Sequence, residues 1–358
     1  MLYETLRRLL FMLDPESAHG VIHSQIGWAS HLGLNRLVAE VPPEDPVTVM
    51  GIRFPNTIGL AAGFDKNADM ITPLGAMGFG HIEVGTLTPL PQPGNPRPRC
   101  FRIVEKSAVI NRMGFNNCGV EQAMANLERS AAGFRLRGGV VGINIGKNAS
   151  TPVAEAVPDY LKALEAVYEH ADYVAVNVSC PNQKDLCDLQ GVEYLRALMT
   201  AVMKKRDELA AKKGGRPVPV AVKLSPDLSD DELKDTADLL LELGVDGVIA
   251  TNTTTSRPGL DGIPTASQQG GLSGKPLGMR STEVIRIIHE HTGGKLPILA
   301  SGGVMSAADA LEKVKAGASV VQLYTGFIYS GPQLITDSVR AIQAHRREQE
   351  RPVEEGVQ

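Results

Sequence analysis

One lysine lies within a short apolar run of this sequence, and five asparagines stand at the ends of such runs or in the loops between them. Lys223 lies within the run VAVKLS, where burying an unpaired ammonium group would be costly. Three interpretations are open for it: a stem that snorkels from a strand end, a Schiff-base amine, or a fixed cation beside a developing negative charge. The asparagines are Asn111, Asn144, Asn177, Asn182 and Asn252. One such residue alone is usually a turn or cap residue, but five amides suit a ligand with several carbonyl and N–H groups.

Two glycine-containing pairs end the last two apolar runs. They are Gly302-Gly303 and Thr325-Gly326. Loops after strands seven and eight of α/β barrels commonly bind phosphate, because glycine lets backbone N–H groups approach an anion closely. The alternative is that these glycines only make tight turns. The pattern predicts a phosphate group without saying which molecule carries it.

Cys180 is the cysteine best placed for chemistry, since it lies in a polar loop between Ser179 and Pro181. A thiol there acts as a base or nucleophile if its pKa is lowered, and is otherwise a small apolar residue. The second interpretation applies to Cys100, Cys118 and Cys187. Because the four cysteines lack zinc-ribbon spacing, no metal site is expected.

Eight β-rich runs position these residues. They span 57–63, 81–86, 140–146, 173–179, 218–225, 247–252, 297–303 and 320–326. Their residues are apolar at nearly every position, which is typical of parallel strands covered on both faces. Helical periods separate many of the runs, and Ser229 with Glu232 forms a capping box before one of them.

The repeat predicts an α/β fold, a (β/α)8 TIM barrel preceded by a small N-terminal helical hairpin, with the active site at the carboxyl ends of the strands. No G-x-G-x-x-G fingerprint follows the first run, which favours a barrel over an open dinucleotide-binding sheet. The expected organisation is a hairpin over 1–32, a Pro-rich linker over 33–56, the barrel over 57–346 and a charged tail over 347–358. Residues 87–139 exceed an ordinary connection and are expected to be loop-rich and functional.

Composition excludes several classes of protein. The net charge of −4 argues against a nucleic-acid partner. No apolar run of ~18 residues is present, so no membrane span is expected. Arg7 and Arg8 interrupt the first apolar stretch, which argues against a signal peptide.

Several long motifs in order resemble the dihydroorotate dehydrogenase family. They are GLAAGFDKN (59–67), VGTLTPLPQPGNPRPR (84–99), INRMGFNN (110–117), GINIGKN (142–148), NVSCPN (177–182), AVKLSPDLS (221–229), ATNTT (250–254), GGLSG (270–274), SGG (301–303) and VQLYTGFIYSGP (321–332). The resemblance covers the barrel and the hairpin, and the hairpin is similar to that of class 2, the membrane-associated, quinone-reducing branch.

The resemblance implies an FMN flavoprotein that oxidises (S)-dihydroorotate to orotate in pyrimidine biosynthesis. By matching positions, the FMN residues would be Ala62, Gly63, Lys66, Thr86, Asn144, Asn177, Lys223, Thr251, Gly274, Gly303, Tyr324 and Thr325. Dihydroorotate would be bound by Lys66, Asn111, Arg112, Met113, Gly114, Phe115, Asn177, Asn182, Asn252 and Thr253. Beside a flavin, the fixed-cation role of Lys223 is favoured over a Schiff base.

Cys180 falls where the family places its catalytic base, and here the sequence departs from its branch. Class 2 members usually carry serine at this position, whereas cysteine is typical of the soluble class 1 enzymes. The following segment, NQKDLCDLQ, also lacks the Pro-Gly usual there.

The hairpin has an apolar face on each predicted helix, which either packs on the barrel or faces a membrane. The resemblance favours a mouth through which a membrane quinone approaches the flavin, bordered by His19 and Arg102, in a peripheral protein on the cytoplasmic face of the cell membrane. Residues 1–40 carry three Arg and no Lys against one Asp and three Glu, so attachment is expected to be apolar.

Three other functions are alternatives to a quinone-dependent enzyme. The first is a soluble class 1-type enzyme that uses fumarate or NAD, which Cys180 favours and the hairpin disfavours. The second is a non-redox aldolase barrel with Lys223 as its Schiff base. The third is a non-enzymatic membrane module built on the hairpin. A flavin spectrum bleached by dihydroorotate separates the last two from the rest.

Overall fold

Eight parallel strands form a closed barrel in a computed structural model that describes residues 2–32, 40–179 and 191–350. The strands are β3 (Ile58–Leu60), β4 (His81–Leu87), β7 (Val140–Ile145), β8 (Tyr173–Asn177), β9 (Val220–Leu224), β10 (Gly247–Ala250), β12 (Ile298–Ser301) and β13 (Val320–Leu323). Each pairs with the next along the chain, and β13 pairs with β3 to close the circle. The predicted TIM barrel and all eight predicted strands are therefore confirmed.

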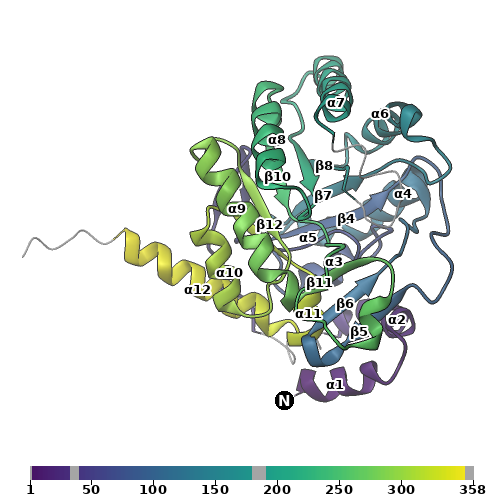
Figure 1. The fold of residues 1–358 in the computed structure, drawn as a ribbon, viewed down its shortest axis with the longest axis vertical. Coiled ribbons are helices and arrows are strands. Elements are labelled where there is room, and N and C mark those ends of the chain that lie inside the picture. Colours follow the sequence, from purple (N-terminus) through teal and green to yellow (C-terminus); the bar gives the residue numbers. More distant parts are fainter. Residues whose placement is uncertain (1, 33–39, 180–190, 351–358) are drawn as a thin grey trace, which may run out of the picture.

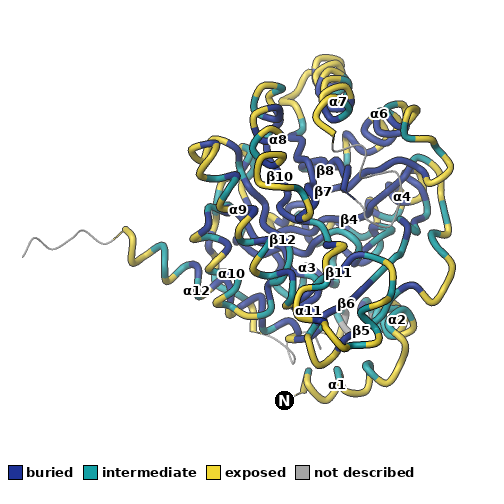
Figure 2. Tube along the Cα trace, viewed as in Figure 1, coloured by how far each residue is buried: buried dark blue, intermediate teal, exposed yellow. Residues whose placement is uncertain are grey.

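Helices cover the outside of the barrel (Figure 1). They are α3 (Ile71–Gly75), α4 (Gly119–Ser130), α5 (Ala132–Arg135), α6 (Ala156–Val167), α7 (Val192–Lys213), α8 (Asp230–Glu242), α9 (Gly278–Thr292), α10 (Ala307–Lys315), α11 (Thr325–Ser330) and α12 (Gln333–Gln349). Figure 2 shows the strands buried and the outer faces of the helices exposed. The capping box is present, since the Ser229 side chain accepts from the Glu232 backbone N–H and Glu232 bonds back to Ser229.

A short hairpin closes the amino-terminal end of the barrel. Its strands, β1 (Val47–Val49) and β2 (Ile52–Phe54), pair antiparallel. Phe54 and Val49 pack with Val140 and Val320, the first residues of two barrel strands. Part of the segment expected as a linker over 33–56 is thus a barrel plug. Its strands are three residues long, too short for a period-2 pattern to be recognised.

The long excursion between β4 and β7 is more ordered than the expected loop. It contains β5 (Cys100–Ile103), β6 (Ala108–Asn111), α4 and α5. β11 (Gly271–Gly274), far along the chain, pairs with β6 to complete a three-stranded antiparallel sheet. The sequence did not reveal this sheet because its third strand follows a different barrel strand.

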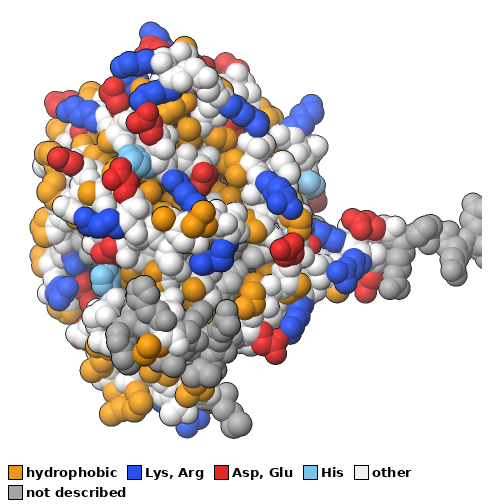
Figure 3. All heavy atoms as spheres, turned by 180° about the vertical axis from the view of Figure 1, so that it is seen from behind, with side chains coloured by type: hydrophobic (Ala, Val, Ile, Leu, Met, Phe, Trp, Pro, Cys, Tyr) orange, Lys and Arg blue, Asp and Glu red, His pale blue; other side chains and the backbone are white. Residues whose placement is uncertain are grey.

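Two N-terminal helices, α1 (Leu2–Phe11) and α2 (Pro15–His31), form the expected hairpin. The Tyr3 hydroxyl donates to the Ile328 carbonyl at 2.7 Å, and the Arg99 guanidinium pairs with Glu16 at 3.0 Å. Hydrophobic side chains gather at the lower edge of the molecule, where Figure 1 places α1, while charged side chains are scattered over the rest of that face (Figure 3). None of the described helices is long and apolar enough to cross a membrane.

Candidate active site

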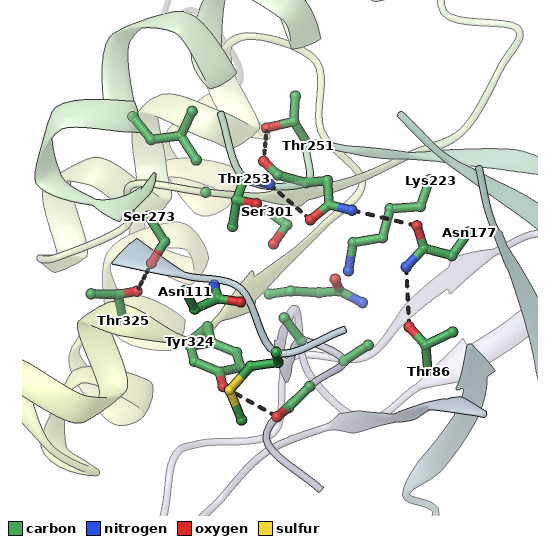
Figure 4. A pocket seen from close by; sticks show the side chains of 18 of the residues that line it. Thr86, Asn111, Asn177, Lys223, Thr251, Thr253, Ser273, Ser301, Tyr324 and Thr325 are labelled. Atoms are coloured by element: carbon green, nitrogen blue, oxygen red, sulfur yellow. Dashed lines mark hydrogen bonds between the residues drawn. The ribbon is translucent and has the colours of Figure 1, made fainter. Parts of the chain in front are cut away.

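A cavity opens at the carboxyl ends of the barrel strands, where side chains from many βα loops meet (Figure 4). Most of the predicted site residues line it: Ala62, Gly63, Lys66, Thr86, Asn111, Met113, Gly114, Phe115, Asn177, Lys223, Thr251, Asn252, Thr253, Gly274, Gly303, Tyr324 and Thr325. The residues come from strand ends that are far apart in the sequence, and closure of the barrel brings them together.

Two of the described residues that were predicted to bind FMN or dihydroorotate do not line the cavity. Arg112 turns away from it, donating to Gln268 at 3.0 Å and stacking over the Phe101 ring at 4.8 Å. Asn144 lies behind the wall, where it accepts from Thr86. Cys180, Asn182 and Cys187 lie outside the described residues.

One end of the cavity is built from glycine backbone. Gly303 has φ +72°, and an ideal Cβ there would lie 2.1 Å from the Cα of Gly278. Gly274 is equally restricted, since its Cβ would lie 2.3 Å from the Ser107 carbonyl oxygen. The Thr325 hydroxyl, beside them, donates to Ser273 at 2.8 Å. Backbone and hydroxyl groups packed this closely fit a phosphate group and leave no room for a side chain.

The opposite end of the cavity is lined by amides held in a chain of hydrogen bonds. The Asn252 amide donates to Asn177 at 3.4 Å, and Asn177 donates to the Thr86 hydroxyl at 3.1 Å. Thr86 in turn donates to Asn144 at 2.6 Å. Figure 4 shows Asn177 and Thr86 on the side of the cavity away from Ser273 and Thr325. The chain fixes which amide atoms face the cavity, as a polar planar ligand requires.

Lys223 reaches the cavity beside these amides and is paired with a buried carboxylate. Its Nζ lies 3.5 Å from Glu83, and the two side chains are 7% and 0% exposed. Glu83 also accepts from Asn144 at 2.8 Å and from Gln322 at 2.8 Å. Burial and the adjacent Glu83 hold the pKa of Tyr173, a further donor to Glu83, well above its usual range.

Glu83 and Gln322 were not predicted from the sequence. Gln322 is the one polar residue of β13, and Glu83 lies between two apolar residues of β4, so a polar side chain flanked by apolar residues within a buried strand was the available signal.

Lys66 and Tyr324 meet at the Gly63 carbonyl on the wall of the cavity. Lys66 Nζ donates to this oxygen at 2.6 Å and the Tyr324 hydroxyl donates to it at 3.1 Å. Burial lowers the pKa of Lys66 and raises that of Tyr324. A half-buried ammonium at this position is suited to a ligand carboxylate.

The loop from Asn111 to Phe115 is braced from the preceding loop. The Gln92 amide donates to the Gly114 carbonyl at 3.0 Å, and the Asn95 amide donates to the Arg112 carbonyl at 2.9 Å. These contacts satisfy carbonyls on the outer side of the loop, so Met113, Gly114 and Phe115 face the cavity. Gln92 and Asn95 belong to the recognised motif PQPGNPRPR but were given no role.

A second, largely apolar cavity lies between the helical hairpin and the barrel. Its lining includes Leu6, Leu10, Phe11 and Ile22, together with both predicted tunnel residues. The two cavities share Lys66, Asn111, Met113, Ser273 and Tyr324. An apolar molecule held beneath the hairpin would therefore lie next to the polar site.

His19 and Arg102 have different surroundings in this second cavity. The His19 ring packs edge-on against Phe64 at 5.1 Å between centroids, and burial, with a smaller contribution from Lys66, lowers its pKa to about 4. Arg102 donates to the Phe11 carbonyl at 3.0 Å and holds the end of α1. His19 is thus neutral at pH 7 and offers a hydrogen bond without charge.

The fold and the two cavities define an α/β-barrel enzyme whose polar cavity has a glycine-lined end and an amide-lined end with a paired lysine, and adjoins an apolar cavity. A family model described as dihydroorotate dehydrogenase matches residues 46–345. The chain belongs to the dihydroorotate dehydrogenase family.

Relatives and solved structures agree with this assignment. A protein of Teredinibacter turnerae named dihydroorotate dehydrogenase (quinone) is 51% identical over 343 residues, covering 96% of this chain and 99% of that protein. One of the same name from Azotobacter vinelandii is 51% identical over 352 residues, covering 98% and 99%. The crystal structure of the Eimeria tenella enzyme in complex with ferulenol superimposes with a TM-score of 0.86 at 37% identity, covering 94% of this chain and 92% of that one.

Proposed function

We propose that this chain oxidises (S)-dihydroorotate to orotate in de novo pyrimidine biosynthesis, with FMN as the bound cofactor and a membrane quinone as the final electron acceptor. The observation that supports this most directly is the contact between two cavities of opposite character, through the five residues that they share. A polar substrate and an apolar acceptor would each have a matching chamber next to one flavin.

FMN fits the polar cavity by the chemistry of its two ends. The phosphate would lie against Gly274, Gly303 and Thr325, and the flavin ring would lie beside Lys223 and Thr86. When bound, FMN supplies a two-electron acceptor. Lys223 would offset negative charge that develops beside it, because a preformed cation in a water-poor site needs little reorganisation.

The substrate would be held by charge at one point and by amides elsewhere. Lys66 would pair with the carboxylate, while Asn111, Asn177 and Asn252 would bond the ring carbonyl and N–H groups. This arrangement would present C6 of the substrate to the flavin and C5 to the base. Cys180 is proposed as that base on its sequence position alone.

The pH dependence of flavin reduction tests Cys180. A thiol, with a reference pKa of ~8.5, loses its proton far more readily than a serine hydroxyl. The rate of flavin reduction by dihydroorotate is therefore expected to rise at lower pH in the wild-type protein than in Cys180→Ser. Stopped-flow absorbance over a pH series measures both profiles, and identical profiles would exclude the thiol as proton acceptor.

The hairpin is proposed as the membrane contact, at the cytoplasmic face, with His19 and Arg102 bordering the quinone path. Leu2 and Leu9 on α1 are 56% and 60% exposed. Apolar side chains left in water on a helix that also walls an apolar cavity suit insertion into a lipid surface.

Vesicle binding should depend on these leucines and hardly on salt. Each Leu→Ser change removes about 2 kcal/mol of apolar transfer, so Leu2→Ser/Leu9→Ser should lower partitioning into vesicles by about 10²- to 10³-fold. Sedimentation with vesicles measures this, with Leu136→Ser, at a site 88% exposed on another part of the chain, as the matched control. Release of the wild-type protein by about 1 M salt, where the Debye length is about 3 Å, would contradict apolar attachment.

The first test of the proposed function is the visible spectrum of the purified protein. Bound FMN should colour it yellow, and dihydroorotate added without oxygen should bleach the flavin absorbance. An aldolase or a non-enzymatic membrane module would show neither change. A colourless protein that also fails to bind added FMN would refute the proposal.

A further inference from the structure

A lysine that the proposed chemistry does not use lies behind the glycine end of the polar cavity. Lys313, on α10, is 1% exposed. Its Nζ donates to the Gly278 carbonyl at 3.0 Å, to the Thr282 hydroxyl at 2.8 Å and to the Ser281 hydroxyl. All three acceptors are neutral groups within the first five residues of α9.

No carboxylate among the described residues pairs with this ammonium. Asp309 is the acid whose negative charge acts on Lys313. The Asp309 carboxylate, however, accepts hydrogen bonds from the Met305 backbone N–H at 3.0 Å and from Ser306 at 2.9 Å. Burial accordingly lowers the pKa of Lys313 to about 7. A buried cation without an anion is costly, and such groups are usually paired.

The atoms that Lys313 holds lie directly behind the glycine wall of the cavity and contact it. Ser281, one of its acceptors, donates to the Gly302 carbonyl at 2.8 Å. Gly278, another acceptor, packs so closely against Gly303 that an ideal Cβ on Gly303 would lie 2.1 Å from the Gly278 Cα. Gly302 and Gly303 both line the cavity. The start of α9 and the Gly302-Gly303 loop thus separate the ammonium from the cavity, and the ammonium holds the start of α9 against which that loop packs.

We propose that Lys313 is a positioning residue which holds the glycine wall and supplies the positive charge behind it, so that the site selects a flavin with a phosphate over one without. The proposal rests on the proposed function, because it takes the FMN phosphate to be the anion that pairs with the Lys313 ammonium. Charge acting through a low-dielectric wall is screened little by salt or water.

Paired binding measurements with FMN and riboflavin test the proposal, because riboflavin lacks only the phosphate. Flavin fluorescence during titration of the apoprotein gives both dissociation constants. Lys313→Gln keeps a hydrogen-bond donor and removes the charge, whereas Lys313→Met removes both. Each is expected to weaken FMN about tenfold and to leave riboflavin within twofold.

Lys315→Gln is the matched control on the same helix. Lys315 is 44% exposed and pairs with Glu312 at 3.1 Å, so its loss should change neither constant. An equal loss for FMN and riboflavin in Lys313→Gln would show a merely structural role and overturn the proposal, as would no loss for FMN. If Lys313→Met does not fold, Lys313→Gln carries the test. Failure of the wild-type protein to bind FMN would instead overturn the proposed function itself.

Discussion

Gly303→Ala should lower the affinity of the apoprotein for FMN by at least about 100-fold, equivalent to about 2.7 kcal/mol. The added methyl group would meet backbone on the other side of the cavity wall, 2.1 Å from the Gly278 Cα and 2.4 Å from its nitrogen. Backbone atoms cannot rotate away as a flexible side chain can. The loop must therefore shift and move its N–H groups away from the phosphate. Fluorescence titration with FMN measures the loss.

Gly214→Ala is the control that distinguishes the effect of a steric collision of the new methyl group from the effect of backbone strain. Gly214 ends α7 with φ +70°, close to the +72° of Gly303, but a Cβ there meets nothing within 4 Å. Both substitutions carry the cost of a left-handed alanine, about 1–2 kcal/mol, and only Gly303→Ala adds the collision. Equal FMN affinity in the two variants would contradict a phosphate site at Gly303.

Lys223→Met should slow flavin reduction by dihydroorotate by about 10²- to 10³-fold, the usual effect of removing one preformed stabilising charge or donor. It should also lower the free energy of unfolding by about 3–5 kcal/mol, because Glu83 would be left as an uncompensated buried charge. Single-turnover absorbance measures the first effect and denaturant unfolding of the apoprotein measures the second.

The double variant Lys223→Met/Glu83→Gln distinguishes the two roles of the lysine. Neutralising Glu83 removes the unpaired charge, so at least half of the lost stability should return. The rate of flavin reduction should stay low, since no cation faces the flavin. Recovery of the rate together with the stability would mean that Lys223 only balances Glu83 and does not act on the reaction.

The barrel and most of the site could be predicted from the sequence because both depend on local patterns. Eight apolar runs define the strands, and residues at their ends must meet once the barrel closes. Gly303 and Thr325 are predicted by this pattern alone, without the resemblance to the family. Ser229 and Glu232 marked a helix start by spacing alone, and the structure contains that capping box.

Features that depend on distant pairing were not predictable. Glu83 is the partner of Lys223 only because β4 and β9 face each other across the barrel interior. The sheet of β5, β6 and β11 joins segments about 160 residues apart in sequence (108–111 with 271–274). Arg112 stood inside a recognised motif, yet its side chain braces Gln268 and Phe101, because a motif does not state which side of a loop faces the ligand.

In this protein dihydroorotate should reduce a bound FMN, and a quinone should reoxidise it. Anaerobic double mixing tests this most directly: one equivalent of dihydroorotate is added to the holoprotein, followed by a soluble quinone, fumarate or NAD⁺, while the flavin absorbance is followed. The absorbance should fall on the first mix and return rapidly with the quinone alone. Return with fumarate or NAD⁺ while the quinone has no effect would contradict the account and favour the soluble type of enzyme.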